Sequence, residues 1–281
     1  MVGVMAYERL GEAALDYRPV RYGASKLLFR GPKKQLEGAY AAFLGGTETY
    51  GKFIEEPFPA LIEAETGLRA VNFGWPNAGV DVYLNDPVVL EATRAAAVTV
   101  LQVPGAQNMS NRFYSVHPRR NDRFLKASTL LKTVYSEVDF TEFHFTRHML
   151  TRLKEVSESR FAMVREELRE AWTHRMNLLV TRLGAPVVLV WFAGHAPGEN
   201  ADAPGLDTEP SFVTRAMLDS LRGGVEQIVE VVVSPAAKAA GTAGMVYSEM
   251  EEAAAQEMLG PMAHSEAAAA LSPIIAHYAE G

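Results

Sequence analysis

The chain reads AAFLGGTETYG over residues 41–51, so a short apolar run ends at two glycines followed by a hydroxyl residue. This pattern predicts a buried strand over Tyr40–Leu44, a tight turn at Gly45 and Gly46, and a helix that begins near Thr47. We therefore expect an α/β fold in which the hydroxyl of Thr47 lies at the carboxyl end of a strand.

Four further apolar runs resemble the first, because each is short, rich in Val or Ala, and closed by Gly, Pro or Ser. They predict strands over Leu68–Phe73, Ala97–Val103, Pro186–Phe192 and Gln227–Val233. Longer amphipathic stretches separate these runs, which is the pattern of parallel strands joined by crossover helices. The sequence predicts a three-layer α/β/α domain over residues 36–281 with a mainly parallel sheet of about five strands, preceded by an arm over residues 1–35.

The longer stretches divide into helices and one polar loop. Pro57–Thr66 and Asn85–Ala96 are expected to be connecting helices, and Asp139–Leu183 two consecutive helices with a break near Ser157. Gly194–Pro210 is rich in Gly, Pro, Asp and Asn, which predicts a surface loop able to act as a lid. Two Ala-rich helices, separated by residues 259–264, are expected after residue 248.

Composition excludes several classes of function. The 281 residues carry a formal net charge of −7, which disfavours general binding to nucleic acids or anionic membranes. The chain has no cysteine, so disulfides, thiolate catalysis and cysteine metal sites are excluded. No apolar run has the length of a signal peptide or a membrane span, so we expect a cytoplasmic protein.

Thr47 is the first candidate functional residue. A helix that starts at the carboxyl end of a strand presents free N–H groups and positive potential to an anion. A hydroxyl there can be a nucleophile or can bind an anion. The alternative is structural, with Thr47 starting the helix as a cap beside two turn glycines.

Three later segments carry polar residues where predicted strands or helices meet loops. Residues 72–79 read NFGWPNAG and residues 105–108 read GAQN, both after predicted strands, and residues 261–264 read PMAH before the last helix. With the first block, their order and spacing resemble the SGNH/GDSL hydrolase superfamily, whose members carry a catalytic Ser block, a Gly block, an Asn block and a late Asp-x-x-His block.

This resemblance covers the chain from about Phe43 to the C-terminus and implies roles for particular residues. It implies Thr47 as nucleophile and His264 as base, with Gly46, Gly79 and Asn108 near the oxyanion. Three positions depart from the family pattern. Thr47 stands in place of Ser, and Gly46 and Pro261 stand in place of the two aspartates. Glu48 or Glu257 is a candidate replacement for the missing acid.

A basic segment, YSVHPRRNDR over residues 114–123, follows the Asn block. Arg119 and Arg120 could hold a carboxylate, sulfate or phosphate through paired hydrogen bonds. The alternative is that Asp122 and neighbouring acids pair with them at the surface. The first alternative predicts an anionic small-molecule ligand.

The remaining histidines are weaker candidates for a metal ligand or a catalytic base. His144 and His148 share a helix face at the spacing of a zinc pair, but no third ligand is evident, so we expect neither metal nor cofactor. His195 follows the fourth predicted strand and, like His117, is a rival base to His264.

Three functions remain open from the sequence. The first is a divergent SGNH-like hydrolase or acyltransferase acting on an ester. The second is a non-catalytic SGNH-like protein that binds an anionic ligand. The third is a nucleotide- or sulfonucleotide-dependent transferase, although residues 45–51 match neither the P-loop nor the dinucleotide-binding pattern.

Overall fold

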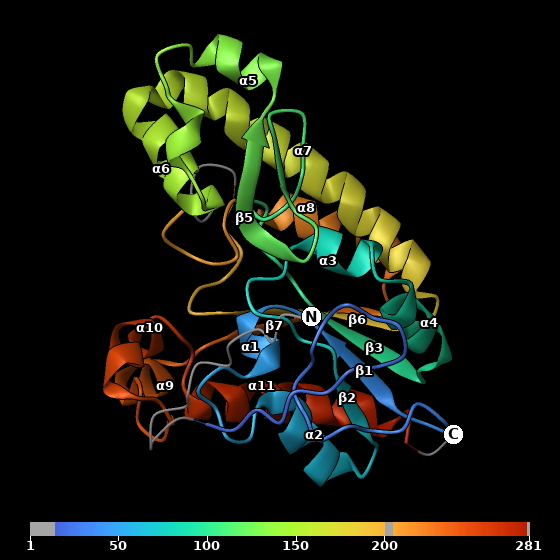
Figure 1. Ribbon diagram of the computed structural model, residues 1–281. Helices are drawn as coiled ribbons and strands as arrows, with labels where there is room; N and C mark the ends of the chain where they lie inside the picture. Colours follow the sequence, from blue (N-terminus) through green and yellow to red (C-terminus); the bar gives the residue numbers. More distant parts are fainter. Residues whose placement is uncertain (1–14, 200–204, 280–281) are drawn as a thin grey trace, which may run out of the picture.

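The central sheet has five parallel strands in the order β2-β1-β3-β6-β7 (Figure 1). The computed structural model describes residues 15–199 and 205–279. Within these, the strands are β1 (Ala41–Leu44), β2 (Ala70–Asn72), β3 (Val98–Gln102), β6 (Val187–Ala193) and β7 (Gln227–Val232). All five predicted strands are confirmed, and the order corresponds to the 2-1-3-4-5 order of flavodoxin-like sheets.

Helices cover both faces of the sheet, which gives the expected three layers. One face packs against α2 (Phe58–Thr66) and α11 (Pro261–Ala276), and its core includes Phe43, Val100 and Val190. The opposite face packs against α3 (Val80–Leu84), α4 (Pro87–Ala95) and α7 (Glu158–Leu183). The strands β1, β3 and β6 are buried throughout, as their continuous apolar runs require.

A second unit, which we call the hairpin lobe (residues 114–156), stands over the carboxyl ends of the strands (Figure 1). Its antiparallel pair is β4 (Tyr114–His117) and β5 (Arg120–Ala127). The lobe also holds α5 (Thr129–Val134), η1 (Phe140–Glu142) and α6 (Thr146–Val156). Sequence reasoning missed this hairpin because the basic residues of β5 hide the alternation that marks a strand.

The break between α6 and α7 falls at Ser157, whose hydroxyl accepts a hydrogen bond from the Arg160 N–H and so caps α7. The expected break is therefore confirmed. The remaining short elements are α1 (Thr47–Tyr50), α8 (Arg215–Asp219), η2 (Arg222–Gly224), α9 (Pro235–Ala240), η3 (Glu249–Glu251) and α10 (Glu252–Gln256).

The described segments closest to the two ends of the chain pack onto the sheet. Of the expected arm over residues 1–35, residues 1–14 lie outside the described residues. Leu27 and Phe29 are fully buried in the core, and the Ser25 hydroxyl donates to Asp86 at 2.5 Å. At the other end α11 begins at Pro261, so His264 lies inside the last helix and not before it. None of the described helices combines the length and apolarity needed to cross a membrane.

Candidate functional site

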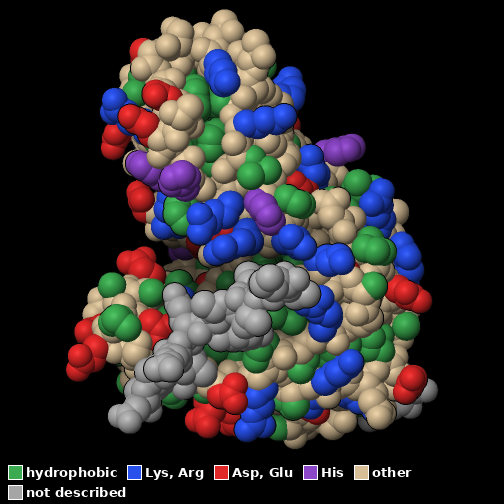
Figure 2. Space-filling model, in the orientation of Figure 1, with side chains coloured by type: hydrophobic (Ala, Val, Ile, Leu, Met, Phe, Trp, Pro, Cys, Tyr) green, Lys and Arg blue, Asp and Glu red, His purple; other side chains and the backbone are tan. Residues whose placement is uncertain are grey.

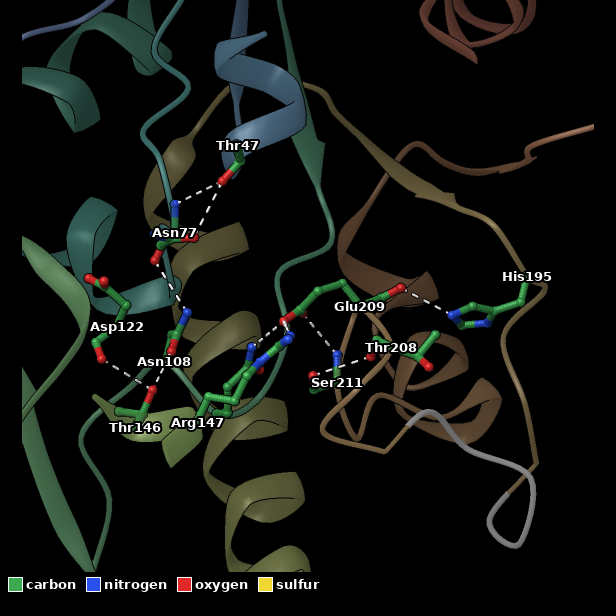
Figure 3. Close-up of polar contacts among 11 residues, drawn as sticks. Thr47, Asn77, Asn108, Asp122, Thr146, Arg147, His195, Thr208, Glu209 and Ser211 are labelled. Carbon is green, nitrogen blue, oxygen red and sulfur yellow. Dashed lines mark hydrogen bonds and ion pairs between the residues drawn. The ribbon is translucent and has the colours of Figure 1, made fainter. Parts of the chain in front are cut away.

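Loops that follow four neighbouring strands, β2, β1, β3 and β6, converge at the carboxyl edge of the sheet (Figure 3). From β1 the chain moves outward to β2, and it then returns to β3 on the other side of β1. Ligands of open parallel sheets bind where the strand order reverses in this way. A ligand site is therefore expected at the loops after β1 and β3.

Thr47 is the first residue of α1, and Gly46 takes the N-cap position without a side-chain cap. The helix therefore starts at Thr47 beside the two glycines, as the structural alternative expects, but the Thr47 hydroxyl does not cap it. The Thr47 hydroxyl accepts a hydrogen bond of 3.1 Å from the Asn77 N–H and lies 3.5 Å from Asn77 Oδ1. It is nearly buried, with 9% of its surface exposed. The loop after β2 thus holds the hydroxyl that follows β1 (Figure 3).

Gln102, the last residue of β3, fixes the turn after β1. Its Oε1 accepts from the Gly46 N–H at 3.1 Å, from the Thr49 N–H at 3.2 Å and from the Thr49 hydroxyl at 2.5 Å. Its Nε2 donates to Glu48 at 2.9 Å. The Gly46 N–H is therefore engaged, which argues against its expected place beside an oxyanion. Sequence reasoning missed Gln102, because a buried glutamine at the end of a strand has no distinctive neighbours.

Gly79 and Asn108 lie in close contact, and each takes part in hydrogen bonds that hold the surrounding loops. The Gly79 N–H donates to Asn121 Oδ1 at 3.1 Å, and a Cβ on Gly79 would stand 1.6 Å from the Asn108 carbonyl oxygen. The Asn108 side chain donates to the Asn77 carbonyl at 3.4 Å and accepts from the Thr146 hydroxyl at 2.8 Å. The N–H of Gly79 is used, whereas the Asn108 amide lies beside Asn77, the residue that contacts the Thr47 hydroxyl (Figure 3).

His264 lies in the helical layer of α2 and α11, where only 1% of its surface is exposed. Its ring packs on Phe58 and Phe192, and its Nδ1 accepts a hydrogen bond of 3.2 Å from the Phe58 N–H. Burial, helped by the positive charge of Arg30, lowers the pKa of His264 to about 3. None of the contacts described for His264 reaches Thr47, so this placement argues against the expected role of base.

The other two candidate bases, His195 and His117, also contact backbone groups. The ring nitrogens of His195 lie 2.9 Å from the Ala196 carbonyl and 3.0 Å from the Glu209 carbonyl (Figure 3). The Nδ1 of His117 accepts from the N–H groups of both Arg119 and Arg120 at 3.2 Å. Each histidine therefore stabilises its own loop, and no described contact joins either one to Thr47.

Glu209 is a central residue that sequence reasoning missed. It lies in the loop after β6, and its carboxylate accepts from Gln107 Nε2 at 2.5 Å, from Arg147 at 3.2 Å and from the Ser211 N–H at 3.1 Å. These contacts connect the loops after β3 and β6 to the hairpin lobe (Figure 3). The predicted polar loop 194–210 contains Glu209, but nothing in its composition distinguishes this acid from its neighbours.

Glu48 is half-buried beside Gln102. Burial raises the pKa of the Glu48 carboxyl, and the negative charge of Glu209 adds to the rise. Carboxyls with raised pKa values are suited to proton transfer near neutral pH, which makes Glu48 a candidate acid or base.

Arg119 lies in the turn between β4 and β5, Arg120 is the first residue of β5, and both have exposed side chains. Neither guanidinium pairs with an acidic side chain in the described part of the chain, so the alternative in which Asp122 neutralises them is wrong. The turn is tied to the site, because Trp75 Nε1 donates to the Arg119 carbonyl at 2.7 Å and the Trp75 N–H donates to the Gly45 carbonyl at 3.0 Å. Figure 2 shows a band of basic and histidine side chains where the hairpin lobe meets the rest of the molecule.

Two other places are less suited to a ligand. His144 and His148 are exposed, and among residues 15–199 and 205–279 no three potential metal ligands cluster. A shallow pocket of about 520 Å³ lies at the amino end of β2, lined in part by Lys34, Glu63 and Arg69. There Lys34 pairs with Glu63 at 2.7 Å and Arg69 donates to two carbonyls, so these charges already have partners.

The family model described as "Domain of unknown function (DUF6473)" matches residues 5–279. No curated protein matches the chain.

Three solved structures are similar to the chain at low identity. A carbohydrate esterase family 2 enzyme with a carbohydrate-binding domain, from Corynascus thermopiles (Myceliophthora fergusii), is 10% identical with a TM-score of 0.41, and the match covers 90% of this chain and 70% of that one. A mutant acetyl-xylooligosaccharide esterase from Geobacillus Stearmophilus is 12% identical with a TM-score of 0.42, covering 85% and 94%. A gut microbial diltiazem-metabolizing enzyme is 13% identical with a TM-score of 0.35, covering 80% and 42%.

Proposed function

Because the chain belongs to the family of domains described as DUF6473, a description that names no activity, we propose a function from the site alone. The chain binds a small anionic molecule at the carboxyl edge of its sheet, between the hairpin lobe and the loops after β1, β2 and β3. The observation that carries this proposal is the pair of exposed, unpaired guanidinium groups of Arg119 and Arg120, within the described residues, on a turn that is tied to the Thr47 loop.

Two arginines of α6 provide a contrast, because each has an acidic partner. Arg147 contacts Glu209 at 3.2 Å, and Arg152 contacts Glu155 at 3.4 Å. In a chain with a net charge of −7, two adjacent arginines without an acidic partner in the described residues leave a local positive potential. A phosphate, sulfate or carboxylate would supply the missing acceptors, since guanidinium groups bind these anions in a bidentate manner.

The turn is also held in place before a ligand arrives. His117 accepts from both backbone N–H groups of the turn, and Trp75 holds the Arg119 carbonyl from the other side. Preorganisation of this kind reduces the entropy lost on binding. The arginine side chains would then be the main groups that adjust.

Calorimetric titration with ethyl phosphate, ethanesulfonate and propionate tests the proposal. We expect at least one of these anions to bind, with an affinity that falls as salt rises because the arginines are exposed. Nucleotides and sulfonucleotides belong in the same titration, since they would test the transferase alternative. If no anion binds, the proposal is wrong.

A second candidate function is acyl transfer from an ester to the Thr47 hydroxyl. Its supporting observations are the position of this hydroxyl at the carboxyl end of β1 and the raised pKa of the neighbouring Glu48. In this reaction Thr47 Oγ1 would attack the acyl carbonyl, Glu48 would take the hydroxyl proton, and the alcohol would leave with a proton. Water would then release the acid, or a second alcohol would accept the acyl group.

Turnover of a panel of short acyl esters separates the two candidates. The hydrolase candidate requires that Thr47→Ala abolish turnover while the matched Thr47→Ser variant, which keeps the hydroxyl, retains it. Equal rates for the wild type and Thr47→Ala would exclude Thr47 as the nucleophile and so eliminate this candidate.

A further inference from the structure

Arg123 has a guanidinium group without an acidic partner in the described part of the chain. It lies on β5, three residues after Arg120, and is partly buried. Its Nε is closed off from solvent and has no hydrogen-bond partner among the described residues. Its two terminal nitrogens also lack a partner within these residues, but they are open to solvent and can donate to a ligand. The hairpin lobe therefore carries a third arginine with unused donors.

The ring of Phe145 holds this guanidinium in place. The Cζ of Arg123 lies 4.4 Å from the ring centroid, and an antiparallel β-bridge joins the backbones of the two residues. Stacking on a ring orients the planar guanidinium without using its N–H donors. Phe145 has 43% of its surface exposed, so the stacked pair lies at the surface, where a ligand can reach it.

Two other stacked arginines provide a contrast, because both have acceptors for their donors. Arg160 lies over the ring of Tyr135 and pairs with Glu137. Arg30 lies over the ring of Tyr17 and donates to backbone carbonyls. These contacts give both arginines a structural role. The stacked arginine of β5 is oriented in the same way, but its donors are left for another molecule.

The position of Arg123 places it beside the proposed binding site. Three residues of an extended strand span at most about 11 Å, so Arg123 is close to Arg120. Its stacking partner Phe145 is followed by Thr146, whose hydroxyl donates to Asn108 at 2.8 Å at the carboxyl edge (Figure 3). One small molecule can therefore contact the basic turn and Arg123 together.

We propose that the ligand carries two anionic groups, one bound by Arg119 and Arg120 and the other by Arg123 on the ring of Phe145. This inference rests on the proposed function, because the first group is the anion that the basic turn holds. A guanidinium binds a phosphate, sulfate or carboxylate through two N–H donors, and stacking has already oriented this one. The ligand class is a small molecule with two such groups joined by a short spacer.

Calorimetric titration with bisphosphates of different length tests the inference. The bisphosphates of 1,2-ethanediol, 1,4-butanediol and 1,6-hexanediol are compared with ethyl, butyl and hexyl phosphate, which have the same carbon chains. We expect at least one bisphosphate to bind about tenfold more tightly than its matched alkyl phosphate, because its second contact is intramolecular. Two equivalent ends alone give a gain of only about twofold, so a tenfold gain indicates a second contact.

Substitution of Arg123 tests where the second anion binds. Arg123→Gln removes the charge and the planar fork, so the preference for the bisphosphate should fall to about twofold while alkyl phosphate affinity stays unchanged. Arg182→Gln, at an exposed arginine at the end of α7, is the matched control for loss of charge and should keep the full preference.

Phe145→Leu is a second variant, at an exposed position. It removes the ring but keeps an apolar side chain, so we expect the preference for the bisphosphate to fall about threefold, the usual weight of an exposed cation–π contact. Thermal unfolding establishes that each variant is folded. If Arg123→Gln does not fold, Phe145→Leu still tests the location.

Indole N–H signals in NMR spectra show whether both kinds of phosphate use the basic turn. Trp75 Nε1 donates to the Arg119 carbonyl, so its signal reports on the turn. Trp191 Nε1 donates to the His195 carbonyl and is an internal reference. Alkyl phosphates and the preferred bisphosphate should both shift the Trp75 signal and leave the Trp191 signal in place.

The outcomes separate the two proposals. Bisphosphates that gain no more than about twofold over the alkyl phosphates would overturn the inference and leave anion binding intact. A preference that stays complete in a folded Arg123→Gln or Phe145→Leu variant, or that falls equally in Arg182→Gln, would also overturn it. Tight binding of a bisphosphate without a shift of the Trp75 signal would do the same. Absence of binding by every phosphate would contradict the proposed function itself.

Discussion

Among the described residues, polar side chains on the α2–α11 face of the sheet have hydrogen-bond partners, whereas several at its carboxyl edge have none. On the α2–α11 face, His264 is enclosed by Phe58 and Phe192 and has its Nδ1 satisfied by a backbone N–H. At the carboxyl edge, Gln107 Oε1 and the guanidinium groups of Arg119 and Arg120 lack partners within the described residues. A histidine that packs between aromatic rings and accepts a backbone hydrogen bond indicates a structural role, whereas polar groups without partners at the ends of strands indicate binding.

Among the predicted substitutions, the largest loss of stability at neutral pH comes from breaking the contact that supports the carboxyl edge. Gly79→Ala would place a Cβ 1.6 Å from the Asn108 carbonyl, so the loop after β3 must shift. We expect the free energy of unfolding to fall by about 3 kcal/mol, as for other overpacked sites. Urea denaturation measures this change in the free energy of unfolding. Gly223→Ala, where no atom lies within 4 Å of the new Cβ, is the matched control and should be nearly neutral.

The structural role of His264 predicts a pH dependence. The unfolded chain has a His pKa near 6.5, whereas burial lowers the pKa of His264 to about 3 in the folded state. The unfolded state therefore takes up the proton first, so the stabilisation is present above pH 6.5 and is lost as pH falls toward 3. We expect His264 to contribute a slope of about 1.4 kcal/mol per pH unit in this window.

His264→Asn tests this assignment, because its Oδ1 can still accept from the Phe58 N–H while the titrating group is gone. Urea denaturation at pH 4, 5, 6 and 7 should give a shallower slope for the variant than for the wild type, and ligand affinity at pH 7 should be unchanged. Identical slopes would show that His264 is not buried as a neutral ring. A loss of ligand affinity in a folded variant would indicate that His264 belongs to the binding site.

A smaller effect is expected at the basic turn. Removing one guanidinium, by Arg119→Ala or Arg120→Ala, should weaken binding of the anion by about tenfold, or about 1.4 kcal/mol, with little change in stability because both side chains are exposed. Arg182→Ala, at an exposed arginine at the end of α7, is the matched control for loss of charge. An equal loss in the control would mean that net charge, and not the turn, attracts the anion.

The sequence predicts the sheet of this protein well and its site only in part. Buried parallel strands are continuous apolar runs between glycines and prolines, so β1, β3 and β6 could be located directly. Thr47 and Asn108 could be placed at the right edge, because the carboxyl ends of parallel strands lie together. Gln102 and Glu209 could not, because their contacts, Gln102 with Glu48 and Glu209 with Gln107, join segments that are far apart in the chain.

His264 shows why spacing alone misleads. Its distance along the chain fits a late histidine block, but a helix that starts three residues earlier, at Pro261, turns the side chain into the layer between α2 and β6. Where a helix begins decides which way a residue in its first turn faces. Element boundaries are the feature that sequence patterns determine least well.

The central claim is that the unpaired arginine turn binds an anion, and the indole signals of Trp75 and Trp191 test it most directly. We predict that titration of ethyl phosphate into the wild-type chain shifts the Trp75 N–H signal in a saturable manner while the Trp191 signal stays in place. In an Arg119→Ala/Arg120→Ala variant the shift should vanish at the same concentrations. A saturable Trp75 shift of equal midpoint in the double variant, or none in the wild type, would contradict the account.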